Sequence, residues 1–180
     1  MTIAMMLDLE TIGTTPRAVV LQAGWCIFDT GAELPGPPRG SNVDIDSCIR
    51  NGGEVTDGAV RYWLRQPELA RESVAAEGQG IEFVLASLVG EYIEEGCAEL
   101  WAHSPSFDVV IVEHYMRQLG IAVPWTYKGV RDTRTFWAAA ELSGWRRPGL
   151  QGLVSHIAWE DAVAQAHDVQ SAYRHLRPDG

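Results

Sequence analysis

The sequence is poor in positive charge. Its 180 residues include 14 Lys and Arg against 24 Asp and Glu, which gives a net charge of −10 at pH 7. A surface this acidic excludes a broad electrostatic clamp on duplex nucleic acid, because phosphates are bound mainly through Lys and Arg. It does not exclude an enzyme that handles only a strand end, since metal ions supply positive charge where carboxylates cluster.

Cysteines and long apolar runs are also scarce. The three cysteines, Cys26, Cys48 and Cys97, are odd in number and fit no zinc-binding spacing. Reduced thiols in a cytoplasm are the simplest interpretation. No apolar stretch approaches the roughly 20 residues of a membrane span, and no basic segment precedes a long apolar one at the start, as in a signal peptide. We therefore expect a cytoplasmic protein with no membrane partner.

The length and the order of the predicted elements indicate one α/β domain over residues 1–180. Apolar residues make up 46% of the chain. The predicted strands are 2–7, 18–28, 42–45 and 98–102. The predicted helices are 56–66, 67–76, 81–95, 106–119, 133–142 and 157–176. Loops are expected at 34–41, 124–130 and 146–152. This order predicts a mixed central sheet with helices packed on both faces.

The first acidic motif, Asp8-Leu9-Glu10, follows the apolar run 3–7. This run contains no turn residue and is typical of a short buried strand. Residues two apart on a strand point to the same face, so the two carboxylates lie side by side. Their repulsion is commonly offset by a divalent cation. The motif therefore predicts a metal site at the end of a strand.

Other titratable residues stand at the predicted starts of two helices. Asp108 ends the motif Ser106-Phe107-Asp108, and His156 precedes Asp161 by five positions. If these acids meet the first motif, they would bind two hard cations through oxygen. Two such ions about 3.5–4 Å apart stabilise the attacking and leaving oxygens in phosphodiester cleavage. The histidine could then accept the proton of the attacking water.

Three motifs in this order, at 8–16, 100–108 and 156–166, resemble those of DEDD-superfamily 3′–5′ exonucleases in the histidine-containing (DEDDh) subgroup. Within the subgroup, the likeness is to phage DNA exonuclease A, exodeoxyribonuclease VIII and mycobacterial exoribonuclease-like domains. Segments 55–66, 124–127 and 131–135 are also similar. The resemblance implies a ribonuclease H-like fold and a divalent-metal-dependent 3′–5′ exonuclease that converts single-stranded DNA or RNA to nucleoside 5′-monophosphates.

The resemblance also implies a role for each matching position. Two Mg²⁺ ions, which Mn²⁺ could replace, would be bound by Asp8, Glu10, Asp108 and Asp161. The general base would be His156. The terminal nucleotide would be contacted by Leu9, Glu10 and Thr11. Related enzymes often pair, so a homodimer is a further expectation.

Several residues near these motifs are open to more than one interpretation. The segment 102–105 departs from the small residue, Asn and Gly that are usual in the subgroup, which leaves its substrate contacts open. Arg134 has no assigned role. The pair Arg146-Arg147 either meets a phosphate or forms an exposed turn. His167 and Asp168 are expected on a solvated helix surface.

Two other functions compete with exonuclease activity. A silent nucleic-acid-binding module is disfavoured because such a descendant need not keep paired carboxylates. A nucleotide triphosphatase is disfavoured because no Gly-rich phosphate loop is present, although other small-molecule phosphohydrolases are not excluded. Trp63 and Trp125 are expected to pack in the core rather than stack on bases. No residue identifies a partner for the 2′-hydroxyl, so the choice between DNA and RNA stays open.

Overall fold

The computed structural model describes residues 1–150 and 152–177, and its strands form one sheet in the order β3-β2-β1-β4-β5. The strands are β1 (Ile3–Thr11), β2 (Val20–Asp29), β3 (Arg39–Asn42), β4 (Glu99–Ala102) and β5 (Val130–Asp132). The first three pair antiparallel, and β4 and β5 continue the sheet in parallel from β1. The predicted mixed sheet is confirmed.

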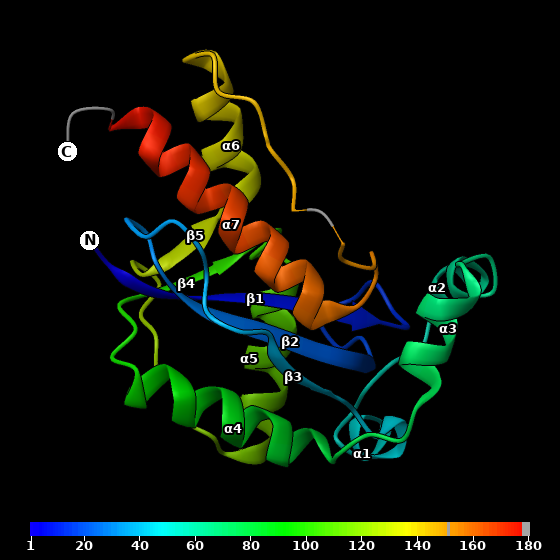
Figure 1. Cartoon of the computed structure of the whole chain (residues 1–180). Coiled ribbons are helices and arrows are strands. Elements are labelled where there is room, and N and C mark those ends of the chain that lie inside the picture. The colour runs from blue at the N-terminus through cyan, green and yellow to red at the C-terminus, as the bar shows by residue number, and fades with distance from the viewer. Residues whose placement is uncertain (151, 178–180) are drawn as a thin grey trace.

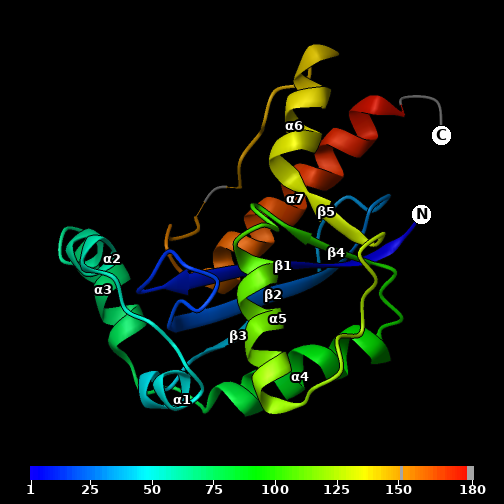
Figure 2. The ribbon, with the colours of Figure 1, turned by 180° about the vertical axis from the view of Figure 1, so that it is seen from behind.

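Helices cover both faces of this sheet. They are α1 (Ile45–Arg50), α2 (Asp57–Trp63), α3 (Glu68–Ala75), α4 (Ile81–Glu94), α5 (Asp108–Leu119), α6 (Thr133–Leu142) and α7 (Ala158–Leu176). α6 and α7 lie on one side, α4 and α5 lie on the other, and α2 and α3 project beyond one end of the strands (Figure 1, Figure 2). None of the helices in the described ranges is long and apolar enough to span a lipid bilayer.

β1 directs its side chains alternately to the two faces of the sheet, as a strand must. The odd-numbered side chains enter the hydrophobic core beneath α4 and α5: Met5, Leu7 and Leu9. The even-numbered ones enter the core beneath α6 and α7: Ala4 and Met6. Asp8 and Glu10 continue this even-numbered face, so both carboxylates project toward the helix pair that includes α7.

The neighbouring strand β4 is much shorter than β1. It pairs only with residues Ala4 to Leu7 of β1 and ends at Ala102. Beyond Leu7, β1 keeps its β2 partner but has no β4 partner. The start of α5 follows β4 in the chain, so the early end of β4 opens a notch beside Asp8 where α5 begins.

On its other side, β1 pairs with β2, and Asp8 lies opposite Gly24. A Cβ atom at Gly24 would lie 2.1 Å from the backbone nitrogen of Trp159, at the start of α7. Because only glycine leaves this space free, the first turn of α7 packs directly on the sheet. The missing side chain thus brings α7 close to the first acidic motif.

Two predicted boundaries were wrong between residues 34 and 50. The strand expected at 42–45 is instead β3, which lies earlier at Arg39–Asn42 and takes its first three residues from the expected loop 34–41. Ile45 begins the unpredicted helix α1, because the Asp44 side chain accepts hydrogen bonds from the backbone N–H groups of Asp46 and Ser47. An aspartate in this capping position stops a strand and starts a helix.

Other elements differ from their predictions at the ends. β1 runs to Thr11 rather than Leu7, so the first acidic motif lies within the strand and not after it. Val130 starts the short strand β5, at the end of an expected loop. Thr56 occupies the N-cap position of α2 as predicted, but its side chain makes no capping hydrogen bond. The six predicted helices are all present.

Candidate active site

Asp8 lies on β1, and a residue of α7 binds its side chain. Its Oδ1 accepts a hydrogen bond of 2.7 Å from Nε2 of Gln165. Burial raises the pKa of Asp8 well above its ordinary value, and the nearby charges of Asp108, Glu10 and Asp161 raise it further. The carboxyl group therefore stands among three others, which come from β1, α5 and α7.

Asp108 is the first residue of α5 and is almost completely buried, with 4% of its surface exposed. Its Oδ2 accepts a hydrogen bond of 3.3 Å from the backbone N–H of Ser104. Burial raises its pKa to about 7, against the opposing effect of hydrogen bonds that include the Leu9 backbone and of the Arg134 charge. Asp108 thus fills the notch left by β4 and reaches the backbone of β1.

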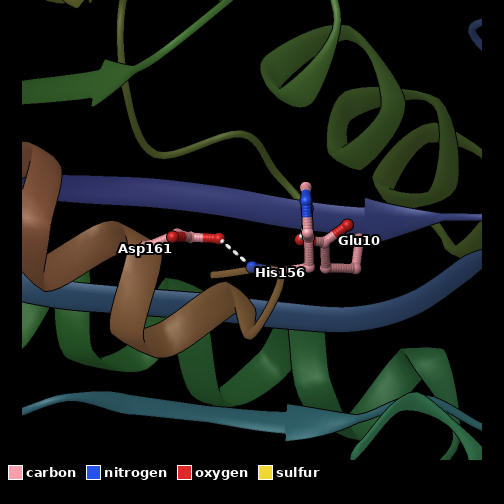
Figure 3. Close-up of side chains that lie close together, drawn as sticks. All are labelled: Glu10, His156 and Asp161. Carbon is pink, nitrogen blue, oxygen red and sulfur yellow. Dashed lines mark hydrogen bonds and ion pairs between the residues drawn. The ribbon is translucent and has the colours of Figure 1, made fainter. Parts of the chain in front are cut away.

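Asp161 lies in the first turn of α7 and fixes the residue that precedes the helix. Its Oδ2 accepts a hydrogen bond of 2.8 Å from the backbone N–H of His156 (Figure 3). His156 has a φ of 66°, the only positive φ among the described non-glycine residues. A conformation this uncommon for histidine persists only when surrounding contacts hold it. Asp161 supplies one of these contacts.

The His156 ring faces Glu10 and Tyr62. Its Nδ1 lies 3.6 Å from Oε1 of Glu10, and the Tyr62 hydroxyl lies 3.2 Å from each ring nitrogen. The rings of Tyr62 and His156 meet edge to face with centroids 5.7 Å apart. Ligand atoms of Glu10, His156 and Asp161 all lie within 4.8 Å of one another. Figure 3 shows that these side chains gather where β1 passes the start of α7.

The acids influence one another's charge. Burial raises the pKa of Glu10 to about 8, and the charges of Asp161 and Asp108 add to the rise. Burial also raises the pKa of Asp161. Carboxyl groups shifted in this direction are poorly stabilised as anions, and a cation among them would reverse the effect. Oxygen donors of this kind suit hard divalent ions such as Mg²⁺ or Mn²⁺.

A cavity of about 410 Å³ borders the acids on the side of α2. We call it the Thr11 cavity. It is lined by Leu9, Glu10, Thr11, Gly13, Thr14, Gly58, Ala59, Tyr62 and Phe107. It thus brings together the three residues that the sequence predicts to contact a terminal nucleotide, and Phe107 lies beside them.

The structure therefore brings together every predicted site residue, at two depths. Glu10, His156 and Asp161 form the compact outer group, and Asp8 and Asp108 lie deeper. Gln165 falls within the third motif, 156–166, but had no predicted role, although it lies four positions after Asp161 and so on the same helix face. Tyr62 was not predicted as a site residue, because it lies 94 positions from His156 and no sequence motif includes both.

The sequence also mispredicted one pair on α7. His167 and Asp168 were expected on a solvated helix surface, but their side chains are only 15% and 6% exposed. Asp168 accepts a hydrogen bond from the backbone N–H of Gly149, in the connection between α6 and α7. Trp63 and Trp125 are both buried, as predicted.

Several solved nucleases are structurally similar to this chain. The chain matches cell-death related nuclease 4 (CRN-4) with 13% identity and a TM-score of 0.60, covering 99% of this chain and 64% of that one. It matches E. coli exonuclease I, solved with a dA13 oligonucleotide, with 14% identity and a TM-score of 0.59, covering 99% and 41%. The nuclease domain of 3′hExo, a DEDDh member bound to rAMP, matches with 9% identity and a TM-score of 0.62, covering 99% and 93%.

These structural similarities establish the fold, which is ribonuclease H-like. The chain spans about two fifths of exonuclease I and just under two thirds of CRN-4. No curated protein sequence matches it. The family described as the 3′-5′ exoribonuclease Rv2179c-like domain matches residues 3–173, nearly the whole chain. The chain therefore belongs to the Rv2179c-like family of 3′–5′ exoribonuclease domains.

Proposed function

We propose that the protein is a divalent-metal-dependent exonuclease that shortens single-stranded nucleic acid from its 3′ end and releases nucleoside 5′-monophosphates. The observation that supports this best is the convergence of four acids from β1, α5 and α7 beside one histidine. The family description makes RNA the first substrate to test. Such a site needs to hold only a strand end, which is compatible with the net charge of −10.

The four acids Asp8, Glu10, Asp108 and Asp161 would hold two Mg²⁺ or Mn²⁺ ions. Bound ions would stabilise the attacking and leaving oxygens of the phosphodiester. Gln165 orients Asp8 through its hydrogen bond, so one face of that carboxylate is fixed before a ligand arrives.

His156 would accept the proton from the attacking water as general base. Its ring is 37% exposed, so it can be reached by solvent and substrate. The Tyr62 hydroxyl and Glu10 limit the ring's rotation. The backbone bond to Asp161 ties the position of this base to one of the proposed metal ligands.

The Thr11 cavity would hold the terminal nucleotide. Its apolar lining by Leu9 and Phe107 suits a base, and the Thr11 backbone and Glu10 offer hydrogen-bonding groups to the sugar. If the 3′-terminal nucleotide binds in this cavity, the last phosphodiester lies beside the acids and is the bond that is cleaved. Cleavage would then proceed from the 3′ end.

The test is a gel assay with short 5′-labelled RNA and DNA strands in Mg²⁺, Mn²⁺ or EDTA. We expect a ladder that shortens from the 3′ end only when metal is present. His156→Ala should slow it by roughly 100-fold or more, as for loss of a general base. The matched control is His175→Ala, because His175 is an exposed histidine near the far end of the same helix.

The alternative functions predict other outcomes. A binding module would retain the strand without shortening it, and a phosphohydrolase would release phosphate from free nucleotides but leave oligomers intact. Wild-type cleavage rates in His156→Ala would contradict the assignment of the base. All three cysteines are free thiols, which fits a reducing compartment such as the cytoplasm. A homodimer remains our expectation, to be tested by light scattering.

A further inference from the structure

A second cavity of about 290 Å³ opens beside the acids, between α6, α7 and the described residues 143–150 and 152–157 that connect them. We call it the α6–α7 cavity. Its lining includes Asp161 and Gln165 from the site, together with Trp137, Arg147 and Asp168. Arg147 and Gly149 precede residue 151 in this connection, and Leu153 and Ser155 follow it. The α6–α7 and Thr11 cavities have no lining residue in common, and each includes one of the proposed metal ligands.

Arg147 provides a fixed positive charge at this cavity. Its guanidinium lies 4.9 Å from the ring centre of Trp137, in a cation–π arrangement. Its Nε lies 3.6 Å from Oδ2 of Asp168, a buried carboxylate. Within residues 1–150 and 152–177, the two terminal guanidinium nitrogens make no hydrogen bond, and the side chain is 55% exposed. The guanidinium of Arg147 is therefore held by Asp168 and Trp137, and its terminal nitrogens can still bind a ligand.

Two buried polar atoms in the lining have no partner among the described residues. They are Nε1 of Trp137, a donor, and Oε1 of Gln165, an acceptor. Buried polar atoms in native proteins are normally hydrogen-bonded, so unpaired ones in a cavity wall favour a polar ligand. A cation and a donor suit phosphate oxygens, and an acceptor suits a sugar hydroxyl.

Given the proposed function, on which this inference rests, we propose that the α6–α7 cavity binds the nucleotide on the 5′ side of the scissile linkage, with Arg147 on its 5′-phosphate. A strand whose terminal nucleotide fills the Thr11 cavity must continue away from the acids, and the α6–α7 cavity begins at Asp161. Contacts to phosphate fix the register of a strand independently of its sequence. Arg147 is thus a positioning residue for the substrate.

The first experiment uses two substrates that differ in what lies 5′ to the cleaved bond. A p-nitrophenyl ester of a nucleoside 5′-monophosphate offers the terminal nucleotide only. An oligonucleotide also offers the next phosphate. Arg147→Ala should raise KM for the oligonucleotide by about 10-fold, the effect of losing one charge-assisted contact, and leave hydrolysis of the ester unchanged. Arg146→Ala is the control, since it removes the neighbouring charge from a residue that does not line the cavity.

The second experiment needs no variant and so does not depend on folding. An oligonucleotide with an uncharged methylphosphonate at the linkage next to the scissile one should show a similar rise in KM with the wild-type enzyme. The same substitution should add little in Arg147→Ala or Arg147→Gln, because the partner is already lost.

The outcomes separate this assignment from the proposed function. Unchanged cleavage of the methylphosphonate strand by the wild type would overturn the assignment, and so would equal slowing of ester and oligonucleotide in a folded Arg147→Ala. In both cases the wild type still degrades ordinary strands, so the proposed function stands. If the wild type cleaves neither substrate, the proposed function fails and the assignment fails with it.

Discussion

Between Ala4 and Glu10, β1 places hydrophobic side chains on one face of the sheet, and hydrophobic followed by acidic side chains on the other. Beneath α4 and α5, Met5, Leu7 and Leu9 are all buried in one continuous core. Beneath α6 and α7, the row starts with the buried Ala4 and Met6 and ends with Asp8 and Glu10. One strand therefore stabilises the fold with one face and builds the site with part of the other.

The difference between the two faces shows how the candidate site can include buried acids while the domain stays folded. The face toward α4 and α5 gains from burial of apolar surface, at about 25 cal/mol per Å². On the other face, burial and mutual repulsion make the ionised form of the acids unfavourable, as the raised pKa values of Asp8 and Glu10 indicate. Stability and activity should therefore respond to different substitutions in the same strand.

The largest expected effect is on the acidic face. Asp8→Asn removes a charge but keeps the shape and an acceptor for Gln165. Activity should fall by roughly 1000-fold or more, since bound metal contributes several kcal/mol to transition-state stabilisation. The melting temperature of the metal-free protein should stay the same or rise, because one repelling carboxylate is gone. Single-turnover rates and thermal melts in EDTA test this, and a large loss of stability would contradict it.

The apolar face should show the opposite pattern. Leu7→Ala shortens a fully buried side chain. In the sequence Leu7 lies between Met6 and Asp8, whose side chains point to the opposite face of the sheet. We expect a loss of about 2–5 kcal/mol in the free energy of unfolding, as for other buried leucines. The rate per folded molecule should change far less than in Asp8→Asn. Urea unfolding and active-site titration measure the two quantities separately.

The acids should also make the metal-free protein less stable as pH rises. The pKa of Glu10 is about 8 in the folded state against an ordinary 4.5. Both states are protonated below the lower value. Between the two values the unfolded chain ionises first, so stability is lost as pH increases. The loss from about pH 5 to about pH 8 should be on the order of 3–4 kcal/mol.

Thermal melts in EDTA across this range would show the slope, and the same melts with Mn²⁺ should reverse it, because metal binds the ionised form. Glu10→Gln should flatten the slope in EDTA, whereas substitution of an exposed acid such as Asp57 should not. A metal-free protein that becomes more stable from pH 5 to pH 8 would contradict the arrangement of the acids described above.

The smallest effects come from two glycines on opposite sides of the molecule. Gly24→Ala would place Cβ against the α7 backbone, 2.1 Å from the nitrogen of Trp159. Overpacking of this kind costs about 1–3 kcal/mol, and displacement of α7 should also lower activity. Gly90→Ala in α4 meets nothing within 4 Å and should stabilise the helix by about 0.5–1 kcal/mol. Paired melts and rates of the two variants test whether the close approach of α7 is needed.

Local patterns in the sequence predicted much of this fold. The apolar run before Asp8 and the helical periodicity after Asp108 are signals confined to a few residues, and both elements formed where expected. The predicted ends of helices and strands were wrong where a single interaction, or very few residues, determine the element. Asp44 starts α1 by capping it, and β5 has only three residues, too few for a periodic pattern to appear.

Long-range contacts account for the rest of what the sequence could not supply. The hydrogen bond from Gln165 to Asp8 joins residues that are 157 positions apart. The need for Gly24 becomes visible only when α7 lies on it. Asp168 looked solvent-facing because its burial depends on the connection that folds over α7. These features depend on tertiary packing, which local propensity does not encode.

α7 presents three polar side chains at intervals of four and three residues. Asp161 holds the backbone of His156, Gln165 holds Asp8, and Asp168 anchors Arg147. All three contacts come from one helix of 19 residues, so a displacement of α7 would alter them together. A substrate strand bound at Arg147 would then be connected through α7 to His156 and to Asp8.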